Sequence, residues 1–211
     1  QAGANGDYHN NGDVDHLYYI LRGQATMLLG VDKYPVREGD IVYIPPRLNH
    51  RLLNDSSDWI EHLILTFQSP DERQEEGKQP PEPVVRNWRE QSPYSEGHGD
   101  QILWPLLRHR DTPPIKYLTE PKAYCLTRDL YDISRNALQP RGRSKEHSHQ
   151  GIEQIYYILS GRAQILLGEE KGEVQEGDTI LLEEGDLHQL INDGEEWVEY
   201  LILSCKLPEA S

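Results

Sequence analysis

Hydrophobic residues in this chain form short runs of four to six positions, separated by glycine, proline, aspartate and asparagine. In the first third of the chain these runs occupy 17–21, 25–29, 41–44 and 62–67. Runs of this length that contain many β-branched and aromatic residues predict β-strands. Neither half of the chain keeps the 3.6-residue period of an amphipathic helix. Short strands with frequent turns are typical of a sandwich or barrel, so we predict an all-β fold.

The same pattern occurs twice along the chain. Residues 15–67 align without a gap on residues 153–205 when the sequence is shifted by 138 positions, and 23 of the 53 pairs are identical. Identical pairs include Gly23/Gly161, Gly39/Gly177, His50/His188, Asn54/Asn192 and Trp59/Trp197. Chance does not produce an ungapped match of this length, so we interpret the chain as a duplicated domain.

The duplication also suggests where the domains end. We predict a first barrel over 1–70, a linker and inter-barrel segment over 71–122, and a second barrel over 123–211. The charged, proline-rich part at 69–83 cannot bury a core, which predicts an exposed linker. The first copy has no counterpart of the lead-in at 123–147, because Gln1 aligns with residue 139. We therefore expect its N-terminal strand to be missing, or its place to be filled by another element.

The net charge and the cysteine content exclude several classes of partner and metal site. The chain carries 21 Lys and Arg against 36 Asp and Glu, a net charge of −15. This balance argues against nucleic acid or an anionic membrane surface as a partner, and no apolar run approaches the length of a membrane span. The two cysteines lack CxxC spacing, which excludes a thiolate zinc site. We expect free thiols and a cytoplasmic protein.

The second copy contains a set of residues suited to binding a metal. His147 and His149 lie two positions apart, Glu153 follows, and His188 comes from a later strand. Residues two apart on an extended strand project to the same face, so both histidines can point into a barrel. Three imidazoles and a carboxylate are suitable ligands for a divalent first-row metal.

These residues resemble the two motifs of the cupin superfamily, G-x5-HxH-x3,4-E-x6-G and G-x5-PxG-x2-H-x3-N. The resemblance covers both repeats and implies a two-domain bicupin of two tandem jelly-roll barrels joined by a Pro-rich linker. It implies His147, His149, Glu153 and His188 as metal ligands. Two positions depart from the pattern: seven residues instead of six separate Glu153 from Gly161, and Glu183 replaces the proline.

The first copy departs further from the motif. The offset places His9, Asn11, Asp15 and His50 at the four ligand positions. Asparagine is a poor ligand for a transition metal, and aspartate is one methylene shorter than glutamate. Two outcomes stay open: an empty or structural site, or a weaker site at His9, Asp15 and His50 completed by Asn11 or water. We therefore expect one occupied centre, in the second barrel.

Two further residues are candidates for contact with a substrate. Arg143 lies between Arg141 and Lys145, and a regular strand would place all three on the face of His147, where Arg143 could bind a substrate carboxylate. A bulge at Gly142 would instead leave these side chains in solvent. Tyr157 is in phase with Glu153, which predicts that it faces the barrel interior as a substrate contact or as core lining.

Taken together, these features predict a metal-dependent cupin enzyme. The first hypothesis is a dioxygenase-like oxidoreductase that uses Fe(II) on a small organic acid or phenolic compound. Mn, Ni, Zn or Cu would suit the same ligands. The alternatives are a non-catalytic small-molecule-binding or regulatory bicupin, and a metal-dependent isomerase, lyase or decarboxylase. The unpaired edge left by the missing strand predicts a homodimer.

Overall fold

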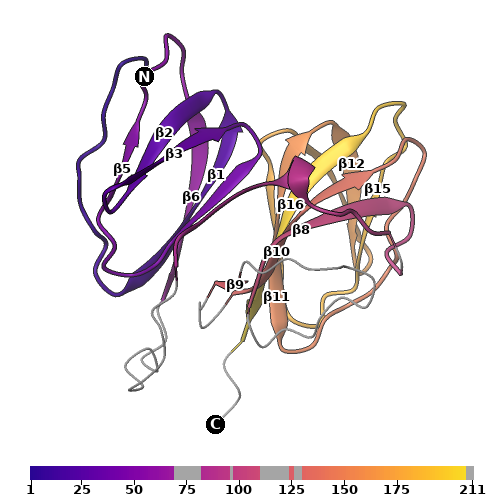
Figure 1. Cartoon of the computed structure of the whole chain (residues 1–211). Helices are drawn as coiled ribbons and strands as arrows, with labels where there is room; N and C mark the ends of the chain where they lie inside the picture. The colour runs from indigo at the N-terminus through magenta and orange to yellow at the C-terminus, as the bar shows by residue number, and fades with distance from the viewer. Residues whose placement is uncertain (69–81, 96, 110–123, 126–129, 208–211) are drawn as a thin grey trace. The chain divides into compact units, whose positions relative to one another are not determined.

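The computed structural model of the chain describes residues 1–68, 82–95, 97–109, 124–125 and 130–207. It divides into two compact units (Figure 1), one centred on Gln1–Glu90 and one that contains the described residues from Gln91 onward, except for the short strand β9 (Tyr124–Cys125), which belongs with the first. Apart from the 3-10 turn η2 (Trp88–Glu90), every regular element in the described residues is a β-strand. The all-β prediction is confirmed. Among the described residues, no helix is long and apolar enough to cross a membrane.

The first unit is built from two antiparallel sheets. One sheet has the order β6-β1-β4-β7, with β1 at Val14–Arg22, β4 at Asp40–Ile44, β6 at Glu61–Gln68 and β7 at Val84–Asn87. The other has the order β3-β2-β5, with β2 at Gln24–Leu29, β3 at Asp32–Arg37 and β5 at His50–Leu53.

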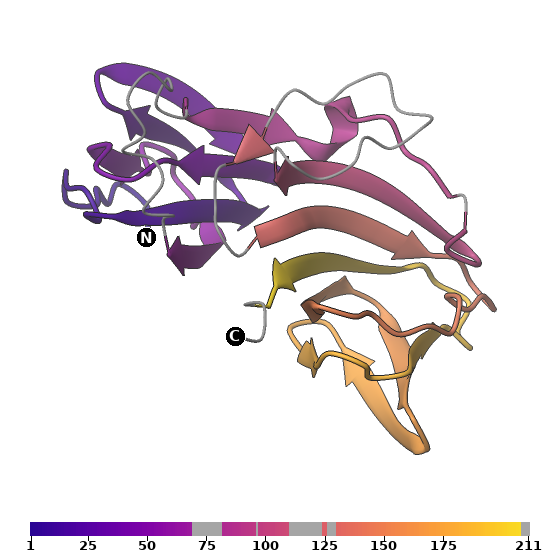
Figure 2. The same ribbon diagram turned by 90° about the horizontal axis from the view of Figure 1, so that it is seen from below.

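The second unit repeats this plan. Its larger sheet contains β14 (Thr179–Leu182), β11 (Ile152–Ser160), β16 (Val198–Lys206), β10 (Leu130–Leu138) and β8 (Gln101–His109), in that order. Figure 2 shows β10 lying between the yellow β16 and the magenta β8. Its smaller sheet has the order β13-β12-β15, formed by Glu170–Gln175, Arg162–Leu167 and His188–Ile191.

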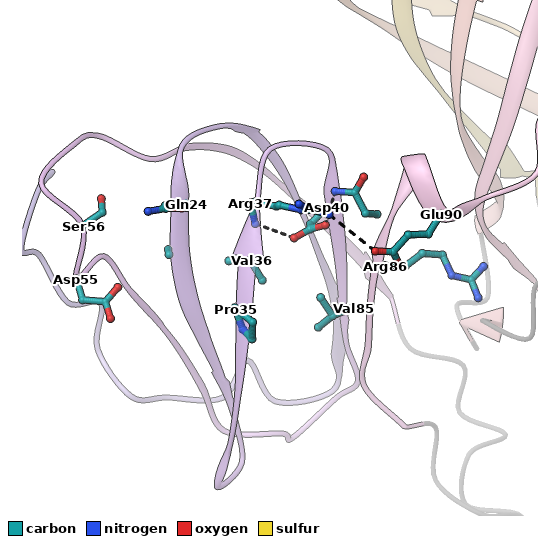
Figure 3. A pocket seen from close by; sticks show the side chains of 12 residues that line it. Gln24, Pro35, Val36, Arg37, Asp40, Asp55, Ser56, Val85, Arg86 and Glu90 are labelled. Carbon is teal, nitrogen blue, oxygen red and sulfur yellow. Dashed lines mark hydrogen bonds and ion pairs between the residues drawn. The ribbon is translucent and has the colours of Figure 1, made fainter.

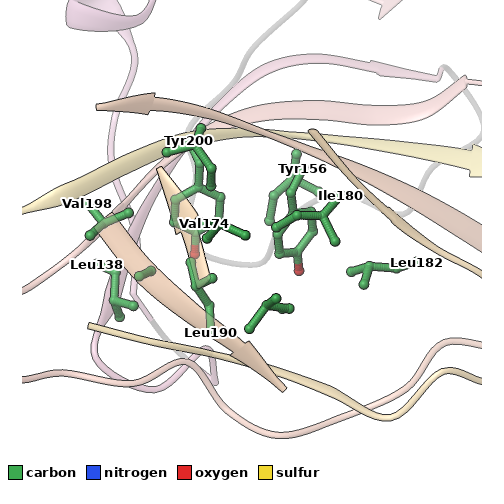
Figure 4. Packing of buried hydrophobic residues seen from close by; sticks show 12 residues of the cluster. Leu138, Tyr156, Val174, Ile180, Leu182, Leu190, Val198 and Tyr200 are labelled. Atoms are coloured by element: carbon green, nitrogen blue, oxygen red, sulfur yellow. The ribbon is translucent and has the colours of Figure 1, made fainter. Parts of the chain in front are cut away.

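Each unit encloses its own hydrophobic core, because alternate residues of the strands point inward. In the first core Tyr18, Ile20 and Met27 are buried. In the second, Tyr156, Ile158 and Tyr200 pack with aliphatic side chains from the facing sheet (Figure 4). The rings of Tyr156 and Tyr200 lie 5.4 Å apart. On β11 the inward positions are therefore 154, 156 and 158, and this phase decides which residues reach the site.

A repeated turn closes one end of each barrel. Gly39 and Gly177 adopt φ angles of 83° and 88°, the left-handed region that favours glycine. The aspartate that follows caps the turn: Asp40 accepts a 2.7 Å hydrogen bond from the Arg37 amide, and Asn87 donates to its other oxygen at 2.6 Å. Figure 3 shows Asp40 beside a cavity of about 700 Å³. The turn aspartate is thus a structural group.

The segment between the two repeats and the edge of the first barrel bear on two predictions from the sequence. The segment 71–122, predicted to be a linker, contributes β7 to the first barrel and β8 to the second, because hydrophobic runs within it pair with strand edges. Strand β6 forms one end of its sheet among the described residues, so the edge from which the sequence predicts a homodimer is present. The dimer itself stays a prediction.

Candidate metal centre

Three histidines converge at one end of the second barrel. His147 and His149 lie on the irregular segment before β11, and His188 is the first residue of β15. The backbones of His147 and His188 pair through hydrogen bonds of 3.2 and 2.9 Å, which brings the two segments together. One ligand atom from each of the three residues lies within 4.8 Å of the other two. In the described part of the chain, this is the one such group of three or more His, Cys, Asp or Glu residues.

The orientation of two rings is set by the backbone. The Nδ1 atom of His147 lies 2.8 Å from the carbonyl oxygen of Lys145, and that of His188 lies 2.8 Å from the carbonyl oxygen of Asp186. Because a carbonyl only accepts, Nδ1 carries the proton and Nε2 keeps its lone pair. The Nε2 atoms of His149 and His188 are buried without a hydrogen-bond partner. Buried polar atoms without partners are costly, and a divalent cation between them would satisfy both.

The electrostatics favour neutral rings. Burial, together with the neighbouring His147 and His188, lowers the pKa of His149 to about 4. Burial also lowers the pKa of His188. A metal ligand must be unprotonated, so this barrel end is prepared for a cation at neutral pH. The residues present therefore fit a divalent metal.

Glu153, predicted as the carboxylate ligand, is not in this group. Its neighbour Gln154 is buried and turns into the barrel with Tyr156, so Glu153 lies on the opposite face of β11. A side-chain hydrogen bond with Gln154 also raises the pKa of His149, which places the amide beside the triad. The available signal was the spacing to Gly161, because the six residues that the motif requires separate Gly161 from Gln154. The fourth candidate donor is a neutral carboxamide.

The same one-residue shift affects the tyrosine assigned to the interior. Tyr157 shares the outward face of Glu153, and its partly exposed side chain does not line the core. Tyr156 lies inside, with its ring 6.1 Å from that of His188 and its hydroxyl 3.4 Å from Oε1 of Gln154. A one-residue difference in strand phase moves every side chain to the other face, so a single cause places Glu153 and Tyr157 away from the barrel interior.

The basic side chains of Arg141, Arg143 and Lys145 do not point toward the histidines. Arg143 and Lys145 are exposed, while the intervening Ser144 is buried. Arg143 is held through its backbone amide, which donates to the Asp100 carboxylate at 3.0 Å. Arg141 is exposed and pairs with Glu195. The three basic side chains therefore lie in solvent, which is the second of the two arrangements considered from the sequence. The reason is that Ser144, and not its basic neighbours, takes the inward position.

His98, which belongs to no sequence motif, lies beside the three histidines of the site. The pKa of His98 is lowered by burial and then by the charges of His147 and Lys145. Its ring packs edge-on against Tyr94, with centroids 5.5 Å apart. Its carbonyl oxygen accepts a hydrogen bond from the Lys145 amide at 3.3 Å. No motif could have indicated it, because the segment has no counterpart in the other repeat.

The first barrel holds a related but different cluster. His9 and His50 occupy the places of His147 and His188, with ring centroids 4.7 Å apart. His16, not Asp15, turns inward, and the amide nitrogen of Asn11 lies 3.0 Å from Nδ1 of His16 and 3.3 Å from Nε2 of His50. An N–H donor thus engages the lone pairs that a metal would need.

Asp15 does not belong to a second metal site. It is fully buried on the opposite face of β1 from His16, where it accepts a 2.7 Å hydrogen bond from the Tyr43 hydroxyl. The predicted trio of His9, Asp15 and His50 is therefore not brought together. Strand alternation is again the reason. Of the two outcomes left open, the Asn11 contacts favour a structural first site.

The buried position of one histidine in the first barrel leads us to expect that the stability of the protein depends on pH. His62 replaces Tyr200 of the second barrel and stacks on Tyr18, with centroids 5.3 Å apart. Burial lowers the pKa of His62 below 6.5, and its Nδ1 is buried without a partner. Below about pH 6.5 the unfolded chain binds this proton before the folded chain does, so the stability falls as the pH drops toward the folded-state pKa.

We therefore expect the His62→Tyr variant to lose less thermal stability than the wild type when the pH is lowered from 7 to 5. Thermal melts of both proteins, followed by circular dichroism at several pH values, measure the difference. Equal losses would show that His62 is not a source of acid sensitivity.

Comparison with known proteins places this geometry in context. Residues 1–65 and 135–204 match the model of the cupin domain. An uncharacterized protein of Methanocaldococcus jannaschii, MJ1618, is 35% identical over 103 residues, which are 48% of this chain and 78% of that protein.

Solved structures share the fold at low identity. A protein of Pseudomonas aeruginosa named as glyoxylate-induced superposes with a TM-score of 0.71 at 16% identity, covering 95% of this chain and 69% of that one. Oxalate decarboxylase of Bacillus subtilis, studied for its Mn(II) centres, has a TM-score of 0.66 at 15% identity, covering 100% of this chain and 68% of its own. The two domain matches and the two barrels lead to one conclusion: this chain belongs to the cupin domain family and contains two cupin domains.

Proposed function

We propose that the second barrel is a catalytic centre that acts on a small organic acid with the help of a divalent metal. The observation that carries this proposal is the donor set of three imidazoles beside the neutral amide of Gln154. His147, His149 and His188 would hold the metal, and Gln154 would offer its oxygen. No carboxylate of this chain competes with an anionic ligand at that point among the described residues.

A divalent cation held by these uncharged donor types would supply Lewis-acid stabilisation of negative charge on a substrate oxygen. The chain contributes the orientation of the rings, because the Lys145 and Asp186 carbonyls lock two of them. Tyr156, whose ring lies 6.1 Å from that of His188, belongs to the buried core of the barrel together with Leu182 and Leu190, and this core would keep bulk water from the inner side of the site. These features support lyase, decarboxylase or isomerase chemistry.

The metal and the use of oxygen are open to experiment. Fe(II) suits a dioxygenase, and Mn(II) suits the same donors. The oxalate decarboxylase resembled in fold is a manganese protein by its description, which supports Mn(II) as the first metal to test. Dioxygenase activity on an acid or a phenolic compound stays the second candidate, because the histidine-rich donor set also suits Fe(II).

The decisive experiment uses the full chain, stripped of metal and reloaded separately with Mn(II) and Fe(II). Each form is incubated with short dicarboxylates, 2-oxo acids and catechols, while substrate loss is followed by NMR and oxygen by an electrode. Turnover of an acid without oxygen uptake, abolished in His147→Ala, would support the proposal. Metal-dependent oxygen uptake would replace it with the dioxygenase. Tight binding of an acid without turnover would indicate a binding or regulatory protein.

A further inference from the structure

A continuous polar row crosses four neighbouring strands of the second barrel. Gln154 on β11 is paired in register with Ser204 on β16, and Ser204 with Asp132 on β10. Asp132 is paired in turn with Arg108 on β8. Directly opposed side chains in antiparallel strands lie close enough to interact. The row therefore extends from the candidate metal site into the sheet.

The hydrogen bonds of this row have a definite direction. Burial raises the pKa of Asp132 above its usual value, and the side-chain hydrogen bond with Ser204 opposes that rise. The charge of Arg108 also favours the carboxylate form. Because Oγ of Ser204 accepts from the Gln154 amide at 3.0 Å, its single proton is free to be donated to the carboxylate form of Asp132. Oγ of Ser204 is then left as an acceptor.

The orientation of the Gln154 amide follows from this arrangement. Its Nε2 donates to Oγ of Ser204 at 3.0 Å. Its Oε1 lies 3.4 Å from the Tyr156 hydroxyl and is the atom that can accept a hydrogen bond from His149. With the opposite orientation, the amide hydrogens would point at the histidines, and two acceptors would face each other at Ser204.

We propose that Ser204 and Asp132 are positioning residues that hold the Gln154 amide with its oxygen toward the three histidines, so that Gln154 acts as an oxygen donor to the metal. The inference rests on the metal site of the proposed function, but not on any reaction. Outer hydrogen-bond partners of metal ligands are worth about 10- to 100-fold in metal affinity.

The test measures Mn(II) binding by the full chain. Ser204→Ala is expected to weaken Mn(II) binding about tenfold, as measured by chelator competition, and to change the EPR spectrum of the bound ion. Ser204→Thr retains the hydroxyl and should restore both. Asp132→Asn should weaken binding as well, because an asparagine can donate to Ser204 and release the hydroxyl proton toward Gln154.

Ser134→Ala is the matched control. Ser134 is another buried serine of the same sheet whose Oγ accepts a hydrogen bond from Asn136 at 3.0 Å. It should leave Mn(II) affinity and the EPR spectrum unchanged. Equal Mn(II) affinity of wild type and Ser204→Ala would overturn the inference, and so would equal losses in Ser204→Ala and Ser134→Ala. If the wild type binds no Mn(II), the metal site itself fails. Binding without turnover removes only the proposed catalysis.

Discussion

The His188→Ala variant is expected to lose tight binding of a divalent cation, while His50→Ala keeps it. His188 supplies a buried Nε2 without a partner at the point where His147 and His149 converge. Removing it leaves two imidazoles and one amide. The affinity should fall by more than about 100-fold, because a lost ligand costs more than a lost outer partner. Metal analysis of protein purified without chelators, together with titration of the stripped chain, provides the measurement.

His50 is a closely matched control. It occupies the same place in the other repeat and is equally inaccessible, at 1% exposure against 2% for His188. A general cost of emptying a buried histidine would therefore appear in both variants. The wild type should bind one ion per chain, since Asn11 engages His16 and His50 in the first barrel. Loss of the ion in His50→Ala, with retention in His188→Ala, would move the site to the first barrel.

The Gln154→Glu variant should bind a divalent cation more tightly than the wild type. A carboxylate here adds a charge, and two unit charges about 4 Å apart attract by about 4 kcal/mol at an effective dielectric constant of about 20. The cost of burying the carboxylate opposes this gain. We expect a net tightening on the order of 100-fold, which chelator competition would measure. Without metal the variant should melt at a lower temperature, because the carboxylate is then buried beside the neutral histidines.

Glu153→Gln tests the alternative assignment with the adjacent residue. Glu153 lies on the outer face of β11, opposite Cys205, and away from the histidine group. Its substitution should leave metal affinity within about twofold, which is the effect of a distant screened charge. A large loss in Glu153→Gln, together with no change in Gln154→Glu, would restore Glu153 as the ligand and contradict the strand phase described above.

The local hydrophobic pattern and the internal repeat were enough to predict the fold and most of the histidines at the candidate site. Short β-branched and aromatic runs between turn residues form strands wherever they lie, and a 138-residue offset relates His50 to His188 independently of any contact. The HxH pair and the later histidine therefore pointed to one site before its geometry was known. In this sense the barrels, their duplication and the three candidate histidines of the second copy follow from information that is local or repeated in the chain.

Tertiary structure alone decided which face of each strand looks inward. Glu153 matches the motif by residue type and Gln154 by its spacing to Gly161, and the pairing of β11 with β16 determines that Gln154 turns toward the histidines. The same kind of pairing turns His16 inward and Asp15 outward. The position of His98 and the row through Ser204 and Asp132 depend on contacts between segments that lie about fifty or more residues apart in the sequence. Such register is set by the burial of whole sheets, so no short stretch of sequence contains it.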